Sequence, residues 1–436
     1  MPKKKQDLSP EKRLAAALVP EEEWPYALPD GWKWVYLGKI TTIVGGGTPS
    51  SRCPEYYDDG GIPWITPADL SDYNEVYISH GRRNITQLGL EKSSAKLMPE
   101  NTVLLSSRAP IGYVAIAAND ICTNQGFKSF LPSIHFIPEY LYWFLKGNQS
   151  LLQQYASGTT FLELSSRRAS EIKFPIAPLS EQRRLVARIE SLFAKLDAAR
   201  EKVQSVLDSH ETRKAALLHD AFTGKLTARW QEEHNLSYNE WHLVYIKDIC
   251  HSLKYGTAKK SEASGRYVVI RMGNLFDGEI LWDNLAYSND SEDIEKYQLT
   301  PGDVLFNRTN SAALVGKTSI YRGDYPAIYA GYIIKLDYDR QAIDGEFLNY
   351  VMNSPCAKAY CNKVKTDGVN QSNINAKKIG AFQFKLPSLP EQQEIVRILD
   401  RLLAREQRAR QAAEETLAAI DRMKQSILAR AFRGEL

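Results

Sequence analysis

The sequence is poor in residues that hold metals or form disulfides. It has five cysteines, at positions 53, 122, 250, 356 and 361, and only seven histidines among 436 residues. An odd, scattered set of cysteines is typical of a reducing compartment, and no Cys or His pairs recur at zinc spacing. We therefore expect ordinary thiols, no metal site and a cytoplasmic protein.

Long apolar runs and catalytic motifs are also missing. No stretch reaches transmembrane length, and the N-terminus has no signal-peptide core. The segment Gly-Gly-Gly-Thr-Pro at 45–49 lacks the Lys-Ser/Thr of a phosphate-binding loop, so we interpret it as a flexible, ligand-facing loop. The Asn-Pro-Pro-aromatic motif of amino-methyltransferases is absent. Glu171 and Lys173 have the spacing of many nucleases but no upstream acidic partner, and a strand with one charged face explains them better.

Charge of one sign is not in large excess either. The net charge is +3 with a pI near 8.4, and 43% of the residues are hydrophobic. This length and composition predict a globular chain of two or more domains. The small positive charge is compatible with nucleic acid but does not argue for it unaided.

What the sequence does contain is a long repeat. Leu-Ser-Glu-Gln at 179–182 returns as Leu-Pro-Glu-Gln at 389–392, and Ala-Phe-Thr-Gly-Lys-Leu at 221–226 returns as Ala-Phe-Arg-Gly-Glu-Leu at 431–436. The offset is 210 residues at both ends, so no gap separates them. Two segments of equal length have therefore been kept in register.

Both copies carry apolar residues at alternating steps of four and three, the pattern of a heptad seam. Ser180 is a plausible N-cap of the first helix, Ser388 with Glu391 forms a capping box for the second, and Gly224 and Gly434 end them. Each helix would be about 60 Å long. Each stripe could be buried in its own domain, but exact duplication favours an intramolecular helix pair. The seam comprises Leu185, Ile189, Leu192, Leu196, Ala199, Val203 and Val206 in the first copy, and Ile395, Leu399, Leu402, Ala409, Ala413, Ile420, Met423 and Ile427 in the second.

The segments between the two helices also repeat. A strand-like start at Trp32 returns at Trp241, and an apolar helix at 139–145 returns at 346–352. The loops between these landmarks share little. We predict an α+β fold in which two mixed α/β domains are separated by two long helices that form an antiparallel coiled coil, with a pseudo-twofold internal repeat. The expected segments are an N-terminal arm (1–30), a first domain (31–174), a first helical spacer (175–227), a second domain (228–384) and a second spacer (385–436).

The loops of both domains are rich in side chains that can reach base edges and phosphates. Taken singly, each such residue is more often a solvated or structural one. The DNA-binding candidates are Thr48, Arg52, Tyr57, Ser107, Arg108, Gln125 and Thr159 in the first domain, and Lys254, Lys260, Arg271, Asn307, Arg308, Asn370, Gln371 and Asn375 in the second.

The alternation of variable domain and repeated helix, with Pro-Leu-Ser-Glu-Gln-Arg-Arg-Leu at 178–185 and the matching close at 221–226, resembles the specificity subunit of type I restriction-modification enzymes. Gly-Gly-Thr-Pro at 46–49 through Ile-Pro-Trp-Ile at 62–65 also resembles the start of a common target-recognition domain of that family. Gln393 and Glu394 depart from the more usual Arg183 and Arg184 of the first copy.

The resemblance implies a non-catalytic, DNA-binding subunit that recognises a bipartite, asymmetric site in phage defence. Each target-recognition domain would read one half-site. Two methyltransferase subunits, which bring S-adenosylmethionine, and ATP- and Mg²⁺-dependent motor-nuclease subunits would bind it, with no cofactor in this chain. A related system whose partner fuses nuclease and methyltransferase fits equally well. A coiled-coil adaptor that binds proteins, and a self-contained DNA-modifying enzyme, are the alternatives from other classes.

Overall fold

The structure, a computed structural model, describes residues 9–157, 162–369 and 371–436. The chain divides into two compact units. Unit 1 comprises the chain up to Val203 together with Thr416–Leu436, and unit 2 comprises Gln204–Glu415. Each unit therefore contains one predicted domain and parts of both predicted helices. Within the described residues, no helix is long and apolar enough to span a membrane.

Unit 1 is built on a five-stranded sheet, a three-stranded sheet and a strand pair. The five-stranded sheet has the order β2 (Ile43–Gly45), β9 (Phe127–Phe130), β6 (Val103–Ser107), β7 (Ile111–Ala117), β4 (Tyr77–Ile78). The second has the order β5 (Arg83–Ile85), β3 (Tyr57–Ile65), β8 (Cys122–Thr123), and β1 (Lys33–Tyr36) pairs with β10 (Lys173–Ile176). The helices are α1 (Pro10–Ala15), α2 (Leu37–Ile40), α3 (Gln87–Glu91), α4 (Pro138–Gly147), α5 (Gln149–Tyr155) and α6 (Ser166–Ser170).

Unit 2 repeats this plan. Its main sheet has the order β12 (Cys250–Tyr255), β21 (Ile333–Tyr338), β17 (Val304–Asn307), β19 (Thr318–Ile320), its second sheet β16 (Tyr287–Ser288), β13 (Tyr267–Ile270), β20 (Ala327–Tyr329), and β11 (His242–Tyr245) pairs with β24 (Gln383–Leu386). Two small sheets are added, β14 (Leu275–Phe276) with β15 (Glu279–Ile280), and β18 (Thr309–Asn310), β23 (Ser372–Asn373), β22 (Thr366–Asp367). The helices are α9 (Ala228–Glu233), α10 (Ile246–Ile249), α11 (Ser291–Tyr297), α12 (Gly345–Asn353), α13 (Pro355–Val364) and α14 (Ala376–Gly380).

The strand pairings confirm the internal repeat. In each second sheet the middle strand has one antiparallel and one parallel neighbour: β3 pairs antiparallel with β5 and parallel with β8, and β13 pairs antiparallel with β16 and parallel with β20. The apolar helices predicted from the sequence are also present, as α4 and α12. The predicted mixed α/β domains are therefore confirmed as two copies of one topology.

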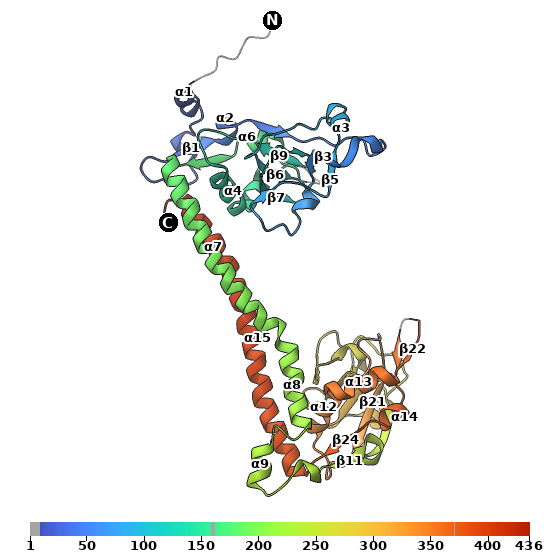
Figure 1. The fold of residues 1–436 in the computed structure, drawn as a ribbon. Helices are drawn as coiled ribbons and strands as arrows, with labels where there is room; N and C mark the ends of the chain where they lie inside the picture. The colour runs from blue at the N-terminus through green and yellow to red at the C-terminus, as the bar shows by residue number, and fades with distance from the viewer. Residues whose placement is uncertain (1–8, 158–161, 370) are drawn as a thin grey trace. The chain divides into compact units, whose positions relative to one another are not determined.

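Parts of three long helices pack into the hydrophobic cores of the two units. They are α7 (Leu179–Asp208), α8 (His210–Phe222) and α15 (Leu389–Phe432) (Figure 1). In unit 1, Arg200 of α7 pairs with Asp421 of α15, and Asp197 pairs with Lys424. Residue numbers rise along one helix as they fall along the other, so the helices run antiparallel, as predicted. In unit 2, Arg213 of α8 bonds to Glu406 of α15 at 2.7 Å, and Thr227, beyond the end of α8, bonds to Glu391 near the start of α15, so this pair is antiparallel as well.

The first copy is not one continuous helix, contrary to our expectation. Ser209 separates α7 from α8, and its hydroxyl donates a hydrogen bond to the carbonyl of Ser205 at 2.6 Å. Such bonds from serine to the preceding turn bend helices. The Arg213 guanidinium donates to the Val206 carbonyl at 3.1 Å and so satisfies an acceptor next to the break.

The helix starts also differ from the predictions. The first helix begins at Leu179, two residues earlier than an N-cap at Ser180 would place it, and the amides of Glu181 and Gln182 bond to the Pro178 carbonyl. Ser388 does precede the second helix, but Glu391 does not serve in a capping box. Its buried carboxylate accepts hydrogen bonds from three side chains of unit 2 instead, those of Thr227, Gln231 and Trp241, at 2.8, 2.6 and 3.0 Å.

The residues of the heptad seam are buried where the helices pack on the domains and are more exposed to solvent elsewhere. Three groups make up the fifteen predicted seam positions: six buried (Leu185, Ile189, Ile395, Leu399, Ala413, Ile420), six half-buried (Leu192, Leu196, Val203, Val206, Leu402, Ile427) and three exposed (Ala199, Ala409, Met423). Met423 is 45% exposed, whereas Leu428, five residues further along α15, is 2% exposed. A straight helix drifts from a strict seven-residue repeat because it has 3.6 residues per turn. The seam prediction is therefore wrong at Ala199, Ala409 and Met423.

One buried glutamine fastens each long helix to its domain. The Gln182 carboxamide accepts a hydrogen bond from the Ile137 amide at 3.0 Å and donates to the carbonyls of His135 and Ala177 at 2.9 and 2.8 Å. Both Gln182 and Gln392 are 0% exposed.

Gln392 makes the same three bonds in unit 2. It accepts from the Asp344 amide at 2.8 Å and donates to the carbonyls of Ala342 and Pro387 at 3.1 and 2.9 Å. In both units the backbone amide that donates to the glutamine lies at the start of the apolar domain helix. One of the two carbonyls that accept from the glutamine lies just before the long helix. We call Gln182 and Gln392 the glutamine locks.

The predicted N-terminal arm is partly built into unit 1. Ser9 caps α1. Ala17 and Val19 are already buried, and the Tyr26 hydroxyl donates to the Phe432 carbonyl at 3.0 Å. Gly434, with a φ of 73°, lies against Pro29. The second half of the arm therefore covers the end of α15.

Replacing a glutamine lock should loosen the unit that holds it. Gln182→Ala or Gln392→Ala strands a buried amide and two carbonyls, so each should lower the free energy of unfolding by roughly 2–4 kcal/mol. Urea unfolding with hydrogen exchange would measure this, and exchange should quicken in the strands of the substituted unit. The matched control is Gln393→Ala, an exposed neighbour that should change stability by less than about 0.5 kcal/mol. Equal effects of all three variants would contradict the lock.

Candidate nucleic-acid interface

Eight of the fifteen candidate DNA-binding residues lie at one end of the main sheet of their unit. In unit 1 this end is formed where β2 and β6 end and β9 begins. In unit 2 it is formed where β12 and β17 end and β21 begins. Because chain connections leave the sheet at these points, variable loops can be exchanged there without changing the strands. We call these two surfaces the loop ends.

At the loop end of unit 1, exposed polar side chains lie close together. The Thr48 hydroxyl donates to the Gln125 side-chain oxygen, and the Tyr57 hydroxyl donates to the Pro49 carbonyl at 2.7 Å. The Arg83 guanidinium lies over the Tyr57 ring, 4.0 Å from its centroid. Arg52 is exposed in the same loop and Arg108 follows β6 directly.

At the loop end of unit 2, the predicted residues are more tightly braced. Arg308 follows β17, and its guanidinium carbon lies 4.7 Å from the centroid of the Tyr255 ring. The Tyr255 hydroxyl accepts from the Ala376 amide at 3.0 Å. Gln371 is exposed beside β23, and Asn375 caps α14 by accepting from the Lys378 amide at 2.9 Å. Asn375 therefore has a structural role whether or not it contacts DNA.

Two candidates are buried and do not belong to either surface. Ser107 and Asn307 are 0% exposed. The Asn307 side-chain oxygen accepts from the Thr309 amide at 3.2 Å and shapes the turn after β17. Sequence alone could not separate these residues from exposed ones because the strands end beside them.

The remaining candidates are spread more widely. Lys254 pairs with Asp337 at 3.0 Å, and Lys260 is exposed in the loop after β12. Arg271 follows β13 and donates to the Asn284 carbonyl. Burial raises the pKa of Tyr332 while the nearby charge of Arg271 opposes this rise, which places Arg271 beside the start of β21. Thr159 and Asn370 lie outside the described residues.

Lys128 is a polar residue that the sequence analysis missed. It is 8% exposed on β9, and its ammonium lies 3.4 Å from the Ser107 hydroxyl and 3.5 Å from the Glu163 carboxylate. A lysine between Phe127 and Phe130 in a buried strand was the available signal, because charged residues are seldom buried without a partner.

The glycine loop at 45–49 is not the flexible loop that we expected. A Cβ on Gly46 would lie 2.0 Å from the Asn124 carbonyl oxygen, and one on Gly47 would lie 2.2 Å from the Ala95 amide nitrogen. The Trp64 indole donates to the Gly47 carbonyl at 2.9 Å. The glycines allow close packing of the backbone, and this packing fixes the position of Thr48.

A second feature is duplicated along the long helices. Unit 1 has a groove of about 1290 Å³ between α4, α7 and α15, and unit 2 has one of about 350 Å³ between α12, α8 and α15. Their walls contain residues at matching repeat positions: Trp143 and Tyr350 on the domain helices, Ala194 and Ala404 on the long helices, and Lys424 and Lys214 opposite them. We call them the helix grooves.

The two helix grooves differ in chemistry. In unit 1, the rings of Trp143 and Phe193 form an apolar patch, with centroids 4.9 Å apart. The Arg200–Asp421 and Asp197–Lys424 ion pairs also line this groove. Burial, together with the charge of nearby Lys424, lowers the pKa of Lys146 there. This groove can accept apolar side chains.

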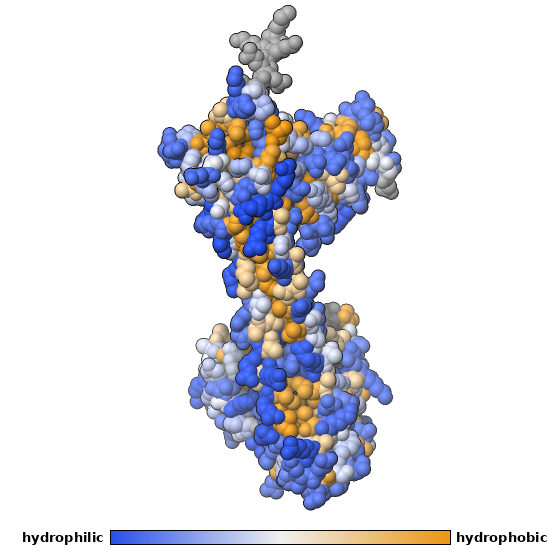
Figure 2. Space-filling model, turned by 60° about the vertical axis from the view of Figure 1, so that its left-hand side comes forward, coloured by the Kyte–Doolittle hydropathy of each residue, from blue (hydrophilic) through white to orange (hydrophobic). Residues whose placement is uncertain are grey.

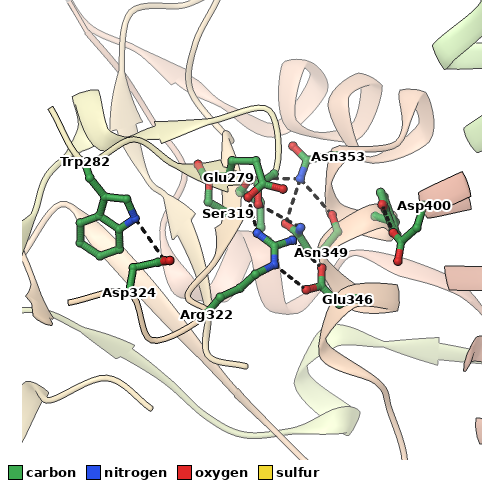
Figure 3. A network of polar contacts seen from close by, with 12 residues as sticks. Glu279, Trp282, Ser319, Arg322, Asp324, Glu346, Asn349, Asn353 and Asp400 are labelled. Atoms are coloured by element: carbon green, nitrogen blue, oxygen red, sulfur yellow. Dashed lines mark hydrogen bonds and ion pairs between the residues drawn. The ribbon is translucent and has the colours of Figure 1, made fainter. Parts of the chain in front are cut away.

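In unit 2, polar side chains occupy much of the equivalent space. Arg322 bridges Glu279 and Glu346, and the Asn353 amide donates to the Thr318 carbonyl at 3.0 Å (Figure 3). The Tyr350 hydroxyl donates to Asp400 at 2.6 Å. Burial raises the pKa of Glu346, although Arg322 opposes this rise.

Metal-binding clusters are not seen in the described part of the chain: no group of three or more His, Cys, Asp or Glu residues there could hold an ion. The five cysteines are free thiols. Burial raises the pKa of Cys122 to about 12, which keeps this thiol protonated and unreactive at neutral pH.

Similar proteins are known across most of this chain. The chain is 27% identical to the StySPI specificity subunit of Salmonella potsdam, over 94% of this chain and 90% of that protein, and 26% identical to the EcoKI specificity subunit of Escherichia coli K12 over the same shares. A 39% identical match to the MjaIX specificity subunit of Methanocaldococcus jannaschii spans 42% of each chain.

Solved structures show the same fold. The HsdS subunit from Thermoanaerobacter tengcongensis has a TM-score of 0.64 and 20% identity, covering 95% of this chain and all of that one. A chain from a structure concerning complex assembly and conformational transition of the type I R-M system has a TM-score of 0.74 and 21% identity, covering 94% of this chain.

The family model for the type I restriction modification DNA specificity domain matches this chain twice, at residues 29–207 and 238–415. These two matches begin near β1 and β11 and so coincide with the structural repeat. The chain therefore belongs to the family of type I restriction-modification specificity subunits.

Proposed function

We propose that this chain recognises a bipartite, asymmetric DNA site, with each loop end reading one half-site. The observation that carries the proposal is that two copies of one topology present different polar side chains at the same sheet end. Two domains that share a fold but differ in their surface residues can each bind DNA and recognise a different base sequence. Gln125 and Thr48 form that surface in unit 1, and Arg308, Tyr255 and Gln371 form it in unit 2.

The chain itself is proposed to be non-catalytic and to direct partner subunits. Methyltransferase subunits would bring S-adenosylmethionine and flip the target adenine out of each half-site. Restriction subunits would bring ATP and Mg²⁺. The small net charge of +3 fits a subunit whose partners contribute to neutralising DNA phosphates.

The helix grooves are proposed to dock two methyltransferase subunits. Equivalent surfaces that occur twice in one chain can bind two copies of one partner, much as a twofold axis would. The face drawn in Figure 2 exposes weakly and strongly apolar residues along the long helices, which supports a protein partner there. Exposed alanines such as Ala194 and Ala404 leave room for partner side chains.

Modified-base sequencing tests the proposed function directly. DNA from cells that express this chain with its methyltransferase partner should carry methylated adenine at a split, asymmetric motif. DNA from cells with the methyltransferase alone is the control and should lack that motif. A stable complex that produces no motif would favour a protein-binding adaptor. Methyl transfer by the purified chain alone would indicate a self-contained enzyme.

Exchanging one exposed glutamine should alter one half-site only. Gln125→Ala changes the loop end of unit 1, and Gln371→Ala changes that of unit 2. Each should relax base preference in its own half-site by roughly tenfold, because a bidentate amide contact to adenine contributes about 1–3 kcal/mol of discrimination. The two variants are controls for each other. If either variant changed both half-sites equally, the assignment of one half-site to each unit would be wrong.

Blocking one groove should remove one partner. Ala194→Arg fills the helix groove of unit 1 and Ala404→Arg that of unit 2, so native mass spectrometry should show each single variant with one methyltransferase copy and the double variant with none. Ala187→Arg is the matched control, because Ala187 is exposed on α7 outside the groove and the equivalent position in unit 2 is Arg397. Two partner copies on the double variant would exclude docking in these grooves.

A further inference from the structure

Arg308 is held in a fixed position at the loop end of unit 2. Its amide donates to the Tyr332 carbonyl at 3.1 Å, and its carbonyl accepts from the Ile374 amide at 2.9 Å. Its guanidinium lies over Tyr255, whose hydroxyl is itself bonded to the Ala376 amide. Backbone and side chain are thus both braced before any ligand arrives, which reduces the entropy lost on binding.

The guanidinium of Arg308 has no acceptor among the described residues. Its Nε is buried without a hydrogen-bond partner. Two other half-buried arginines of unit 2 do have acceptors: Arg213 donates to Glu406 and Arg271 to the Asn284 carbonyl. The two terminal amino groups of Arg308 are not among the buried unpaired atoms, so these donors are open to an acceptor from outside the chain.

The fold itself does not require an arginine here. Ser107 occupies the equivalent position in unit 1, where its amide donates to the Gly126 carbonyl at 2.7 Å and its carbonyl accepts from the Leu164 amide at 2.9 Å. These are the same two backbone bonds that Arg308 makes. The backbone is therefore shared between the units, and the side chain is where they differ.

We propose that Arg308 reads a guanine in the half-site recognised by unit 2, and this inference rests on the proposed function. A planar guanidinium presents two parallel N–H donors to the O6 and N7 acceptors of guanine in the major groove. We call these two parallel donors the fork. Stacking on Tyr255 fixes the plane of the fork, and the single ammonium group of a lysine could not reproduce this geometry. A phosphate contact needs only charge and would not depend on the ring.

The test uses the full chain assembled with its methyltransferase partner and a DNA pool randomised across both half-sites. Modified-base sequencing of the methylated molecules gives base preference at each position. Arg308→Lys keeps the charge and removes the fork. It should relax the preference for guanine at one position of one half-site by roughly tenfold or more, and every other position should keep its preference.

Two further variants distinguish the contribution of the arginine donors from that of the Tyr255 ring beneath them. Tyr255→Leu removes the ring under the guanidinium and should relax the same guanine position more weakly, whereas Tyr255→Phe keeps the ring and should retain most of the preference. Arg266→Lys is the control, since Arg266 is an exposed arginine of the same unit. The unchanged half-site in each variant shows that the complex has folded and assembled.

Three outcomes would overturn the inference while the proposed function stands. The wild-type motif could lack guanine at every position, Arg308→Lys could leave all preferences intact, or it could weaken methylation equally for all sequences, which is the behaviour of a phosphate contact. If the wild-type complex selected no split motif at all, the proposed function would fail and this inference would fail with it.

Discussion

The hydrogen bonds of two buried carboxamides hold the rest of this structure in place. Gln182 and Gln392 each join the first turn of a long helix to the start of the domain helix and to the strand before it. A buried amide with all its partners is rigid, since moving it would strand several polar groups at once. Each domain is thereby fixed to its own helices, and its loop end gains a defined direction relative to them.

Around these locks the two units have diverged in chemistry. Glu391 is buried under three donors, whereas Glu181, at the matching position, is bonded to Arg184 at the surface. Arg184 in turn donates to the terminal carbonyl of Leu436 at 2.6 Å. The helix grooves differ in the same way: one has an aromatic patch beside two ion pairs of the long helices, and the other is crossed by the Arg322 network. The repeat therefore preserves the frame while allowing each end its own contacts.

The sequence predicted the features that depend on pattern and repetition. The antiparallel helices, the two equivalent domains and the apolar helices α4 and α12 follow from apolar spacing and an offset of 210 residues, which any backbone must respect. Ser209 was missed because a break in a helix depends on a local hydrogen bond rather than on apolar spacing. The capping box at Ser388 was wrong because Glu391 finds stronger partners in residues that the sequence places far away.

The candidate site was predicted less completely for a related reason. Residue type identifies side chains that can bind DNA, but burial decides which of them are accessible to a ligand. Arg308 and Ser107 share one backbone position, and only the structure shows that one is stacked at the surface and the other enclosed. The fit of Gly46 and Gly47 against neighbouring backbone likewise depends on strands that lie far apart in the chain.

We propose that the long helices, with the glutamine locks, determine the distance between the two half-sites. α15 is 44 residues long, which corresponds to about 66 Å. The most direct measurement is modified-base sequencing after seven residues are inserted into both helices, following Val203 in α7 and preceding Thr416 in α15. These points leave the Arg200–Asp421 and Arg213–Glu406 pairs intact. The account predicts that the unread gap lengthens by about three base pairs, because seven residues add roughly 10 Å. A methylated motif with an unchanged gap would contradict it.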